Sequence, residues 1–194
     1  DEDVMRGYSQ LQAAMTHGHP TAIAAAELTA VAMRWAALGL ALRHLPRELL
    51  EYARYRSDSY EGEWLGKFGA RHWYKYGYTM KMGWDENISA LVNVMRALRK
   101  RGPIDDPCEL TGAGWIAEEA LATSLFCAVW YRDDPVTAIS MAARTTGDSD
   151  SLASITGGII GAAYGEDAWP LSWRQRIERR PEIEEAIEVT HSLS

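Results

Sequence analysis

Apolar side chains recur at helical spacing along most of the chain. In residues 3–16, Val4, Tyr8, Leu11 and Met15 follow one another every three or four positions, which places them on one face of an α-helix. Later segments keep this spacing, and no stretch alternates apolar and polar residues as a half-buried strand does. The pattern therefore predicts an all-α fold.

Glycine and proline residues divide the pattern into separate helices. Gly18 and Pro20 end the first one, and Asp134 precedes Pro135 as an N-cap precedes the first helical position. We expect helices over residues 3–16, 21–44, 86–101, 115–131, 135–144 and 150–164, a short helix from residue 46, and closing helices over residues 171–179 and 181–189. Residues 57–84 are rich in glycine and aromatic side chains without a helical period, so we expect an irregular segment with room for one short helix.

Residues 21–45 are apolar enough to resemble a membrane span. Glu27 and Arg34 fall inside this stretch, however, and its many alanines contribute little to membrane insertion. Alanine has the highest helix propensity, and its small side chain lets neighbouring helices approach closely. We therefore expect a long helix in the protein core.

Composition and charge narrow the class of protein. A chain of 194 residues, 47% hydrophobic and 24% charged, is expected to form a single helical domain over residues 1–194 with a sizeable core. The net charge of −7 argues against a general nucleic-acid binder, which needs a basic face. Cys108 and Cys127 lie in dissimilar contexts, which favours a reducing compartment and a cytoplasmic location. A signal peptide begins with positively charged residues followed by an apolar stretch. Residues 1–3 are acidic instead, and no apolar stretch follows them.

The most informative polar segment is the acidic turn, residues 147–151, which reads Gly-Asp-Ser-Asp-Ser. Asp148 and Asp150 supply carboxylates and Ser151 a hydroxyl, and these hard oxygen donors suit Mg²⁺ or Mn²⁺. The alternative is that Ser149 or Asp150 only caps the helix that follows. That helix is too apolar for a surface helix, which places the carboxylates near the interior, where a cation is their strongest partner.

The helix behind the acidic turn carries Gly157, Gly161 and Gly165, each four positions from the next. Glycine costs about 1 kcal/mol relative to alanine inside a helix. The stripe therefore predicts that another helix backbone passes close by. Such packing would hold the acidic turn rigidly, as metal ligands require.

A second turn holds His17 and His19 between two helices. Two histidines at this spacing could bind zinc, although neither cysteine is close in sequence. They could also be ordinary turn residues, or donate a hydrogen bond to a ligand.

A third turn, the Gly-rich turn, comprises residues 111–115 and includes Gly112, Gly114 and Trp115. It precedes a helix, where backbone N–H groups are open to a ligand. Its spacing matches neither a P-loop nor a dinucleotide fingerprint. Glu118 and Glu119 follow on the same helix, and we expect them to cap it or to support neighbouring ligands.

In their order along the chain, the three turns resemble motifs of the ADP-ribosylglycohydrolases. The matching segments are Met-Thr-His-Gly-His-Pro (15–20), Gly-Ala-Gly-Trp-Ile-Ala-Glu-Glu-Ala-Leu-Ala (112–122) and Gly-Asp-Ser-Asp-Ser-Leu-Ala-Ser-Ile-Thr-Gly-Gly (147–158). The resemblance implies a compact orthogonal helical bundle that binds two Mg²⁺ or Mn²⁺ ions. It also implies a hydrolase that removes ADP-ribose from a modified protein side chain by cleaving an N- or O-glycosidic bond.

The resemblance assigns roles to seven residues. It implies metal binding by Asp148, Asp150 and Ser151, and substrate binding by His17, Gly112, Gly114 and Trp115. The family usually has threonine where this chain has Ser151, and serine keeps the hydroxyl.

The family's N-terminal half carries an Asp-Asp metal motif, a glycine-rich phosphate loop and an acidic catalytic residue, and the sequence contains none of these. The pairs Asp105-Asp106 and Asp133-Asp134 are interpreted as helix-boundary residues before proline. The resemblance therefore implies a C-terminal half that needs the missing half in cis, in trans or by swapping. Its partners would be ADP-ribosylated protein or ADP-ribose, and neither nucleic acid nor membrane. The alternative is a catalytically silent helical domain that binds ADP-ribose or a protein.

Overall fold

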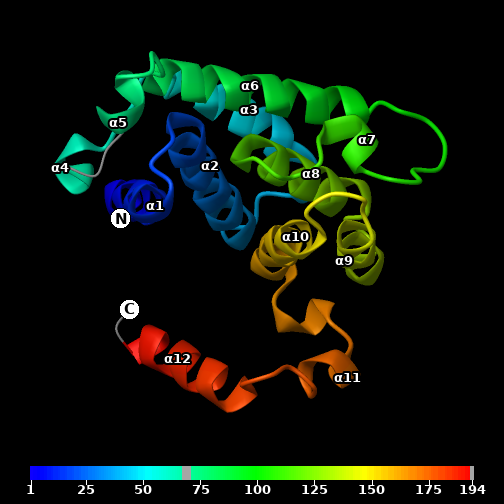
Figure 1. Cartoon of the computed structure of the whole chain (residues 1–194). Coiled ribbons are helices and arrows are strands. Elements are labelled where there is room, and N and C mark those ends of the chain that lie inside the picture. The colour runs from blue at the N-terminus through cyan, green and yellow to red at the C-terminus, as the bar shows by residue number, and fades with distance from the viewer. Residues whose placement is uncertain (67–70, 193–194) are drawn as a thin grey trace.

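The computed structural model describes residues 1–66 and 71–192, and every regular element in these ranges is helical (Figure 1). The α-helices are α1 (Glu2–Thr16), α2 (Pro20–Ala37), α3 (Leu45–Tyr55), α4 (Gly62–Leu65), α5 (Arg71–Tyr74), α6 (Met80–Ala97), α7 (Cys108–Thr111), α8 (Ala117–Trp130), α9 (Pro135–Ala143), α10 (Ser149–Tyr164), α11 (Leu171–Arg174) and α12 (Arg180–Ser192). Two 3₁₀-helices are η1 (Leu42–His44) and η2 (Glu166–Ala168). The all-α prediction is confirmed.

Helix α2 is the centre of the bundle. It contacts α1, α3, α6, α8 and α10, and α6 lies across the top of the bundle in Figure 1. Ile23, Ala24, Leu28 and Ala32 are fully buried, because a helix with neighbours on several sides needs apolar residues around most of its circumference. The predicted core helix is confirmed. Within the described residues, none of the helices combines the length and apolar character that crossing a bilayer requires.

Several predicted boundaries were wrong. Helix α2 ends at Ala37 instead of residue 44, and Gly39 follows with a φ of 93°, a left-handed conformation that favours glycine. Helix α6 begins at Met80, six residues before the prediction, because Thr79 caps it through the N–H of Met82. Helices α4 and α5 lie in the segment expected to be irregular, of which residues 67–70 lie outside the described residues. The four-residue helix α7 was not predicted.

The first helix presents a different face to the core from the one that its apolar spacing indicates. Val4, Tyr8 and Met15 are exposed, whereas α1 buries Gly7, Gln10 and Ala13. The polar Gln10 is buried because its side chain hydrogen-bonds Glu27 of α2. Apolar spacing thus predicted the helix correctly but did not indicate which face packs.

The predicted role of the glycine stripe was wrong. A Cβ on Gly157 would meet only the Ile139 side chain, at 3.3 Å, and Gly165 ends α10 with a φ of 71°. A close backbone approach between helices occurs instead at Gly83 of α6, where a Cβ would lie 2.4 Å from the carbonyl carbon of Pro20. This contact places α6 directly on the first turn of α2.

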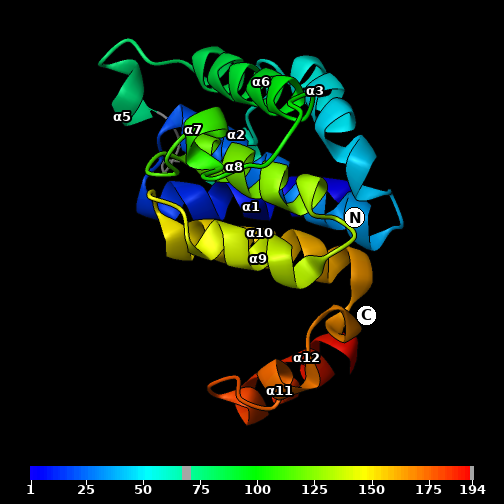
Figure 2. The ribbon, with the colours of Figure 1, turned by 90° about the vertical axis from the view of Figure 1, so that its right-hand side faces the viewer.

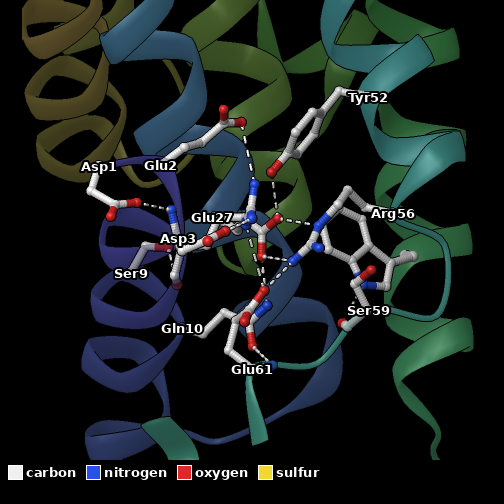
Figure 3. Close-up of polar contacts among 12 residues, drawn as sticks. Asp1, Glu2, Asp3, Ser9, Gln10, Glu27, Tyr52, Arg56, Ser59 and Glu61 are labelled. Carbon is white, nitrogen blue, oxygen red and sulfur yellow. Dashed lines mark hydrogen bonds and ion pairs between the residues drawn. The ribbon is translucent and has the colours of Figure 1, made fainter. Parts of the chain in front are cut away.

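A buried carboxylate joins the first three helices. Glu27 is fully buried and accepts hydrogen bonds from Gln10 (2.5 Å), the Tyr52 hydroxyl (2.6 Å) and Arg56 Nε (2.8 Å) (Figure 3). Arg56 also pairs with Glu61, which precedes α4. Burial opposes protonation of Arg56, but its bonds to Glu27 and Glu61 outweigh this effect and raise the Arg56 pKa, so the guanidinium stays charged. These bonds satisfy groups that would otherwise be costly to bury.

The chain leaves the bundle after α10. In Figures 1 and 2, α11 and α12 lie below the other helices and apart from them. Residues 180–189 are exposed along the whole of this helical stretch, which corresponds to the predicted closing helix. The prediction for residues 171–179 was too long, since α11 spans a single turn. The assignment of residues 1–194 to one domain stays a prediction.

We expect Glu27→Gln to lower the free energy of unfolding by about 3 kcal/mol, because it removes one partner of a buried ion pair. Arg56 keeps Glu61 as a partner, which limits the loss. The matched control is Glu51→Gln, which removes an exposed ion pair with Arg47 and is expected to leave the free energy of unfolding nearly unchanged. Urea denaturation measures both, and equal losses in the two variants would contradict the importance of the buried cluster.

Candidate functional site

The acidic turn forms the N-terminus of α10. Asp148 is the N-cap residue, yet its side chain accepts no capping hydrogen bond from the helix. The Asp150 carboxylate accepts the N–H of Ser151, the next residue, at 3.0 Å. The structure therefore does not place Ser149 or Asp150 at the cap, and capping does not occupy the Asp148 carboxylate.

The two carboxyl groups of the acidic turn face the surface more than the sequence indicates. Asp150 is exposed and Asp148 is half-buried, so the prediction of a buried position was wrong for Asp150. The neighbouring Asp148 carboxyl group, together with the Ser151 N–H, lowers the pKa of Asp150. Two carboxyl groups this close repel each other when both are ionised, and a cation between them would relieve that repulsion.

The Gly-rich turn has a conformation that requires glycine. Gly112 and Gly114 have φ values of 108° and 81°. A Cβ on Gly112 would lie 2.5 Å from the Glu119 side chain, and one on Gly114 would lie 2.8 Å from Leu152. The Glu119 carboxylate accepts the Gly114 N–H at 3.2 Å, so Glu119 supports the turn. This agrees with the supporting role expected for that residue.

The structure brings the Gly-rich turn and the acidic turn into direct contact. The Asp148 N–H donates to the Ala113 carbonyl at 2.8 Å. A Cβ on Gly147 would lie 1.9 Å from the same carbonyl oxygen, so no larger residue fits at that position without displacement of one turn. Two turns that were predicted to bind ligands, more than thirty residues apart in sequence, therefore lie side by side.

Asp106, which joins the start of α7 to Thr146 just before the acidic turn, was missed as a site residue. The Asp106 carboxylate accepts the N–H of Thr146 at 3.1 Å and its hydroxyl at 2.5 Å. It also accepts the Cys108 N–H at 2.9 Å, which agrees with the predicted helix-boundary role. The Asp-Pro sequence indicated only that second role, since nothing local reveals a partner 40 residues away.

The histidine turn occupies the start of α2. His17 is exposed, and its Nδ1 lies 3.0 Å from the Thr16 hydroxyl. His19 is the N-cap of α2 and its ring packs edge-on against Trp73, with centroids 4.5 Å apart. Burial lowers the pKa of His19, with Glu86 opposing the shift, so the ring is neutral at neutral pH. No contact joins His17 to the acidic turn among the interactions of the described residues, so its predicted place beside a ligand stays a prediction.

Glu86 connects the start of α2 to the start of α8. Its carboxylate accepts the Thr21 hydroxyl, and its charge acts on Glu118. Burial raises the pKa of Glu118, and the charges of Glu86 and Glu119 raise it further. The Asp148 N–H at the start of α10 is bonded to Ala113, shortly before α8. The beginnings of α2, α8 and α10 therefore lie toward the same region of the bundle.

A cavity of about 610 Å³ lies between α6, α7 and α8, next to the Gly-rich turn. Its acidic lining residues are Asp85, Glu86, Glu109, Glu118 and Glu119. A cavity with this charge favours cationic groups and repels phosphate. A ligand that carries a diphosphate is therefore expected to place that group outside this cavity.

The donors of the acidic turn fit part of a site for a hard cation. Asp148, Asp150 and Ser151 supply only oxygen atoms, the type that Mg²⁺ and Mn²⁺ prefer. Among the described residues, no three His, Cys, Asp or Glu side chains form a group that could hold a metal ion. This applies to zinc at His17 and His19 as well as to the acidic turn, which contributes two carboxylates. Neither Cys108 nor Cys127 is in a disulfide.

Trp115, at the end of the Gly-rich turn, is 71% exposed, and Ile116 beside it is also exposed. Helix α8 begins two residues later than predicted, at Ala117, which leaves Trp115 in the turn. An exposed indole next to open backbone can act as a wall for a planar or sugar ligand. This position agrees with the predicted contact but does not test it.

The comparisons with known proteins agree with the resemblance. ADP-ribosylhydrolase ARH3 of Homo sapiens is 26% identical over 211 residues, which cover 99% of this chain and 53% of the relative. ADP-ribosylhydrolase ARH3 of Danio rerio is 25% identical over 201 residues, which cover 97% of this chain and 51% of the relative. The chain thus spans about half the length of the curated relatives it matches. A sequence model described as ADP-ribosylglycohydrolase matches residues 1–194, and the chain therefore belongs to the ADP-ribosylglycohydrolase family.

Proposed function

We propose that this chain forms part of a metal-dependent hydrolase that releases ADP-ribose from a modified protein side chain by cleaving an N- or O-glycosidic bond. Family membership and the names of the two relatives support the class of reaction. The observation that supports the site is the hydrogen bond from the Asp148 N–H to the Ala113 carbonyl (2.8 Å), which joins a set of metal donors to a set of sugar-binding groups.

In this proposal, the carboxylates of Asp148 and Asp150 and the hydroxyl of Ser151 would help to hold two divalent cations, Mg²⁺ or Mn²⁺. When bound, the cations supply positive charge that orients and polarises the hydroxyls of the distal ribose. The chain's own contribution is to present three oxygen donors from a turn that the Ala113 carbonyl holds in place.

The sugar would lie against the Gly-rich turn. Gly112 and Gly114 would shape the backbone that the sugar meets, because they adopt left-handed conformations and leave room for Glu119 and Leu152 to pack against the turn. Trp115 would offer an aromatic wall, and His17 would donate a hydrogen bond to ADP-ribose. Glu119 acts indirectly, since its carboxylate is bonded to the Gly114 N–H.

Full activity would require protein groups beyond these. A hard cation takes about six oxygen ligands, whereas the acidic turn offers three residues. The general acid or base is assigned to no residue of this chain, because Glu118 and Glu119 are better explained by support of α8 and the Gly-rich turn. Exposed apolar side chains on α1 (Val4, Met15) and α12 (Ile183, Ile187) offer surface to the other half of such a domain, in cis, in trans or by swapping.

The decisive test is release of ADP-ribose from arginine-modified and serine-modified proteins, with Mg²⁺ and with chelator. The assay uses this chain alone, and then this chain together with the N-terminal half that the family carries. We expect Asp150→Asn to lower release by at least about 100-fold, since even residues that only support metal ligands cost 10- to 100-fold. The control is Asp133→Asn, which changes an exposed carboxylate next to α9 and leaves release unchanged.

Each outcome of this test has a defined meaning. Release that persists in chelator, or in Asp150→Asn, would contradict the metal role of the acidic turn. Binding of ADP-ribose without release, in the presence of both halves and metal, would favour the catalytically silent domain instead.

We also expect Gly147→Ala to abolish most release, because its Cβ would overlap the Ala113 carbonyl and separate the two turns. The control is Gly157→Ala on the same helix, where the Cβ would meet only the end of the Ile139 side chain at 3.3 Å. The same assay measures both variants, and a circular dichroism melt verifies that each is folded. Equal activity of the two variants would show that contact between the turns is dispensable.

A further inference from the structure

We propose that Asp106 is a positioning residue that sets the conformation of the acidic turn for cation binding. This inference rests on the metal role proposed above for that turn. Asp106 itself contacts neither the metal donors nor the Gly-rich turn through its carboxylate; it acts through Thr146.

The contacts of Asp106 divide between two parts of the chain. Oδ1 accepts the N–H of Cys108, the first residue of α7, at 2.9 Å. Oδ2 accepts both the N–H (3.1 Å) and the hydroxyl (2.5 Å) of Thr146. A helix boundary before Pro107 needs only the first bond, so the two bonds to Thr146 have another consequence. They fix the residue that directly precedes Gly147 and Asp148.

The acidic turn is consequently held at two points by one short segment. Asp106 binds Thr146, and seven residues later Ala113 accepts the Asp148 N–H at 2.8 Å. Helix α7 and the Thr111 side chain lie between these points, and the Thr111 hydroxyl is 2.8 Å from that of Thr123 on α8. The segment is therefore anchored to the bundle, and its two ends define where the backbone of residues 146–148 runs.

The charge of Asp106 strengthens this attachment. Burial raises its pKa, but the hydrogen bonds from Thr146 and Cys108 outweigh burial, and the pKa of Asp106 is lowered. The side chain is thus an ionised acceptor at neutral pH, and hydrogen bonds to an ionised acceptor are stronger than those between neutral groups. Groups that orient metal ligands in this way tune affinity without touching the ion.

Asp134 provides a matched control within the chain. Its carboxylate accepts the N–H (3.0 Å) and the hydroxyl (2.6 Å) of Thr137, the same pair of donors that Thr146 offers Asp106. It begins α9, at the end of that helix opposite to the acidic turn. Asp134→Ala therefore removes equivalent hydrogen bonds without affecting residues 146–148.

The test measures Mn²⁺ affinity by titration calorimetry and amide hydrogen exchange by NMR, in the protein that carries this chain. We expect Asp106→Ala to weaken Mn²⁺ binding about 10-fold or more and to accelerate exchange of the Thr146 and Asp148 amides. Asp134→Ala is expected to accelerate exchange at Thr137 and to leave Mn²⁺ affinity within about twofold of wild type.

A second pair of variants changes the other side of the contact. Thr146→Ser keeps the hydroxyl and is expected to bind Mn²⁺ like wild type. Thr146→Val has a similar shape without the hydroxyl, and we expect it to bind Mn²⁺ several-fold more weakly. If Asp106→Ala fails to fold, this pair decides the question.

The outcomes separate this inference from the proposed function. Wild-type protein that binds Mn²⁺, with Asp106→Ala and Thr146→Val unchanged in affinity and in Asp148 exchange, overturns the positioning role alone. Wild-type protein that binds no Mn²⁺ overturns both. Loss of affinity in Asp106→Ala equal to that in Asp134→Ala would mean that general stability is responsible, and it also overturns the positioning role.

Discussion

The candidate site depends on the close approach of two backbone segments at Gly147 and Ala113. The Asp148 N–H donates a hydrogen bond to the Ala113 carbonyl. The same carbonyl lies so close to Gly147 that a Cβ at that position would overlap it. The first residues of α10 are therefore fixed relative to the Gly-rich turn. If the segments were farther apart, the acidic carboxylates and the Gly-rich turn would belong to separate surfaces.

The packing of α2, α8 and α10 on one another supports this contact. Helix α8 packs on α10 through hydrogen bonds at Ser124, which donates to the Leu152 carbonyl at 3.1 Å and accepts from the Thr156 hydroxyl. Helix α2 lies against both α8 and α10, and its buried Glu27 joins it to α1 and α3. The N-terminal ends of α2, α8 and α10 lie toward one region of the bundle, where carboxylates of the acidic turn and of the neighbouring cavity also lie.

Charge divides this region into two environments. The acidic turn presents donors suited to a metal ion, and the neighbouring cavity is lined by carboxylates of α6, α7 and α8. Glu118 lines this cavity, and its burial there raises its pKa. Because both environments are acidic, neither suits a bare phosphate. A ligand with a diphosphate would accordingly need basic side chains or backbone N–H groups outside these two environments.

The sequence by itself determined the helical class, the core position of α2 and the three turns, because these follow from local spacing, capping and backbone freedom. It did not determine which face of α1 is buried, the existence of α7, or the role of Asp106, since each depends on a partner distant in the chain. The glycines show the difference most clearly. Spacing indicated Gly157 and Gly161, whereas the tertiary structure brings a second backbone against Gly83 and Gly147, where a Cβ would overlap backbone atoms of Pro20 and Ala113.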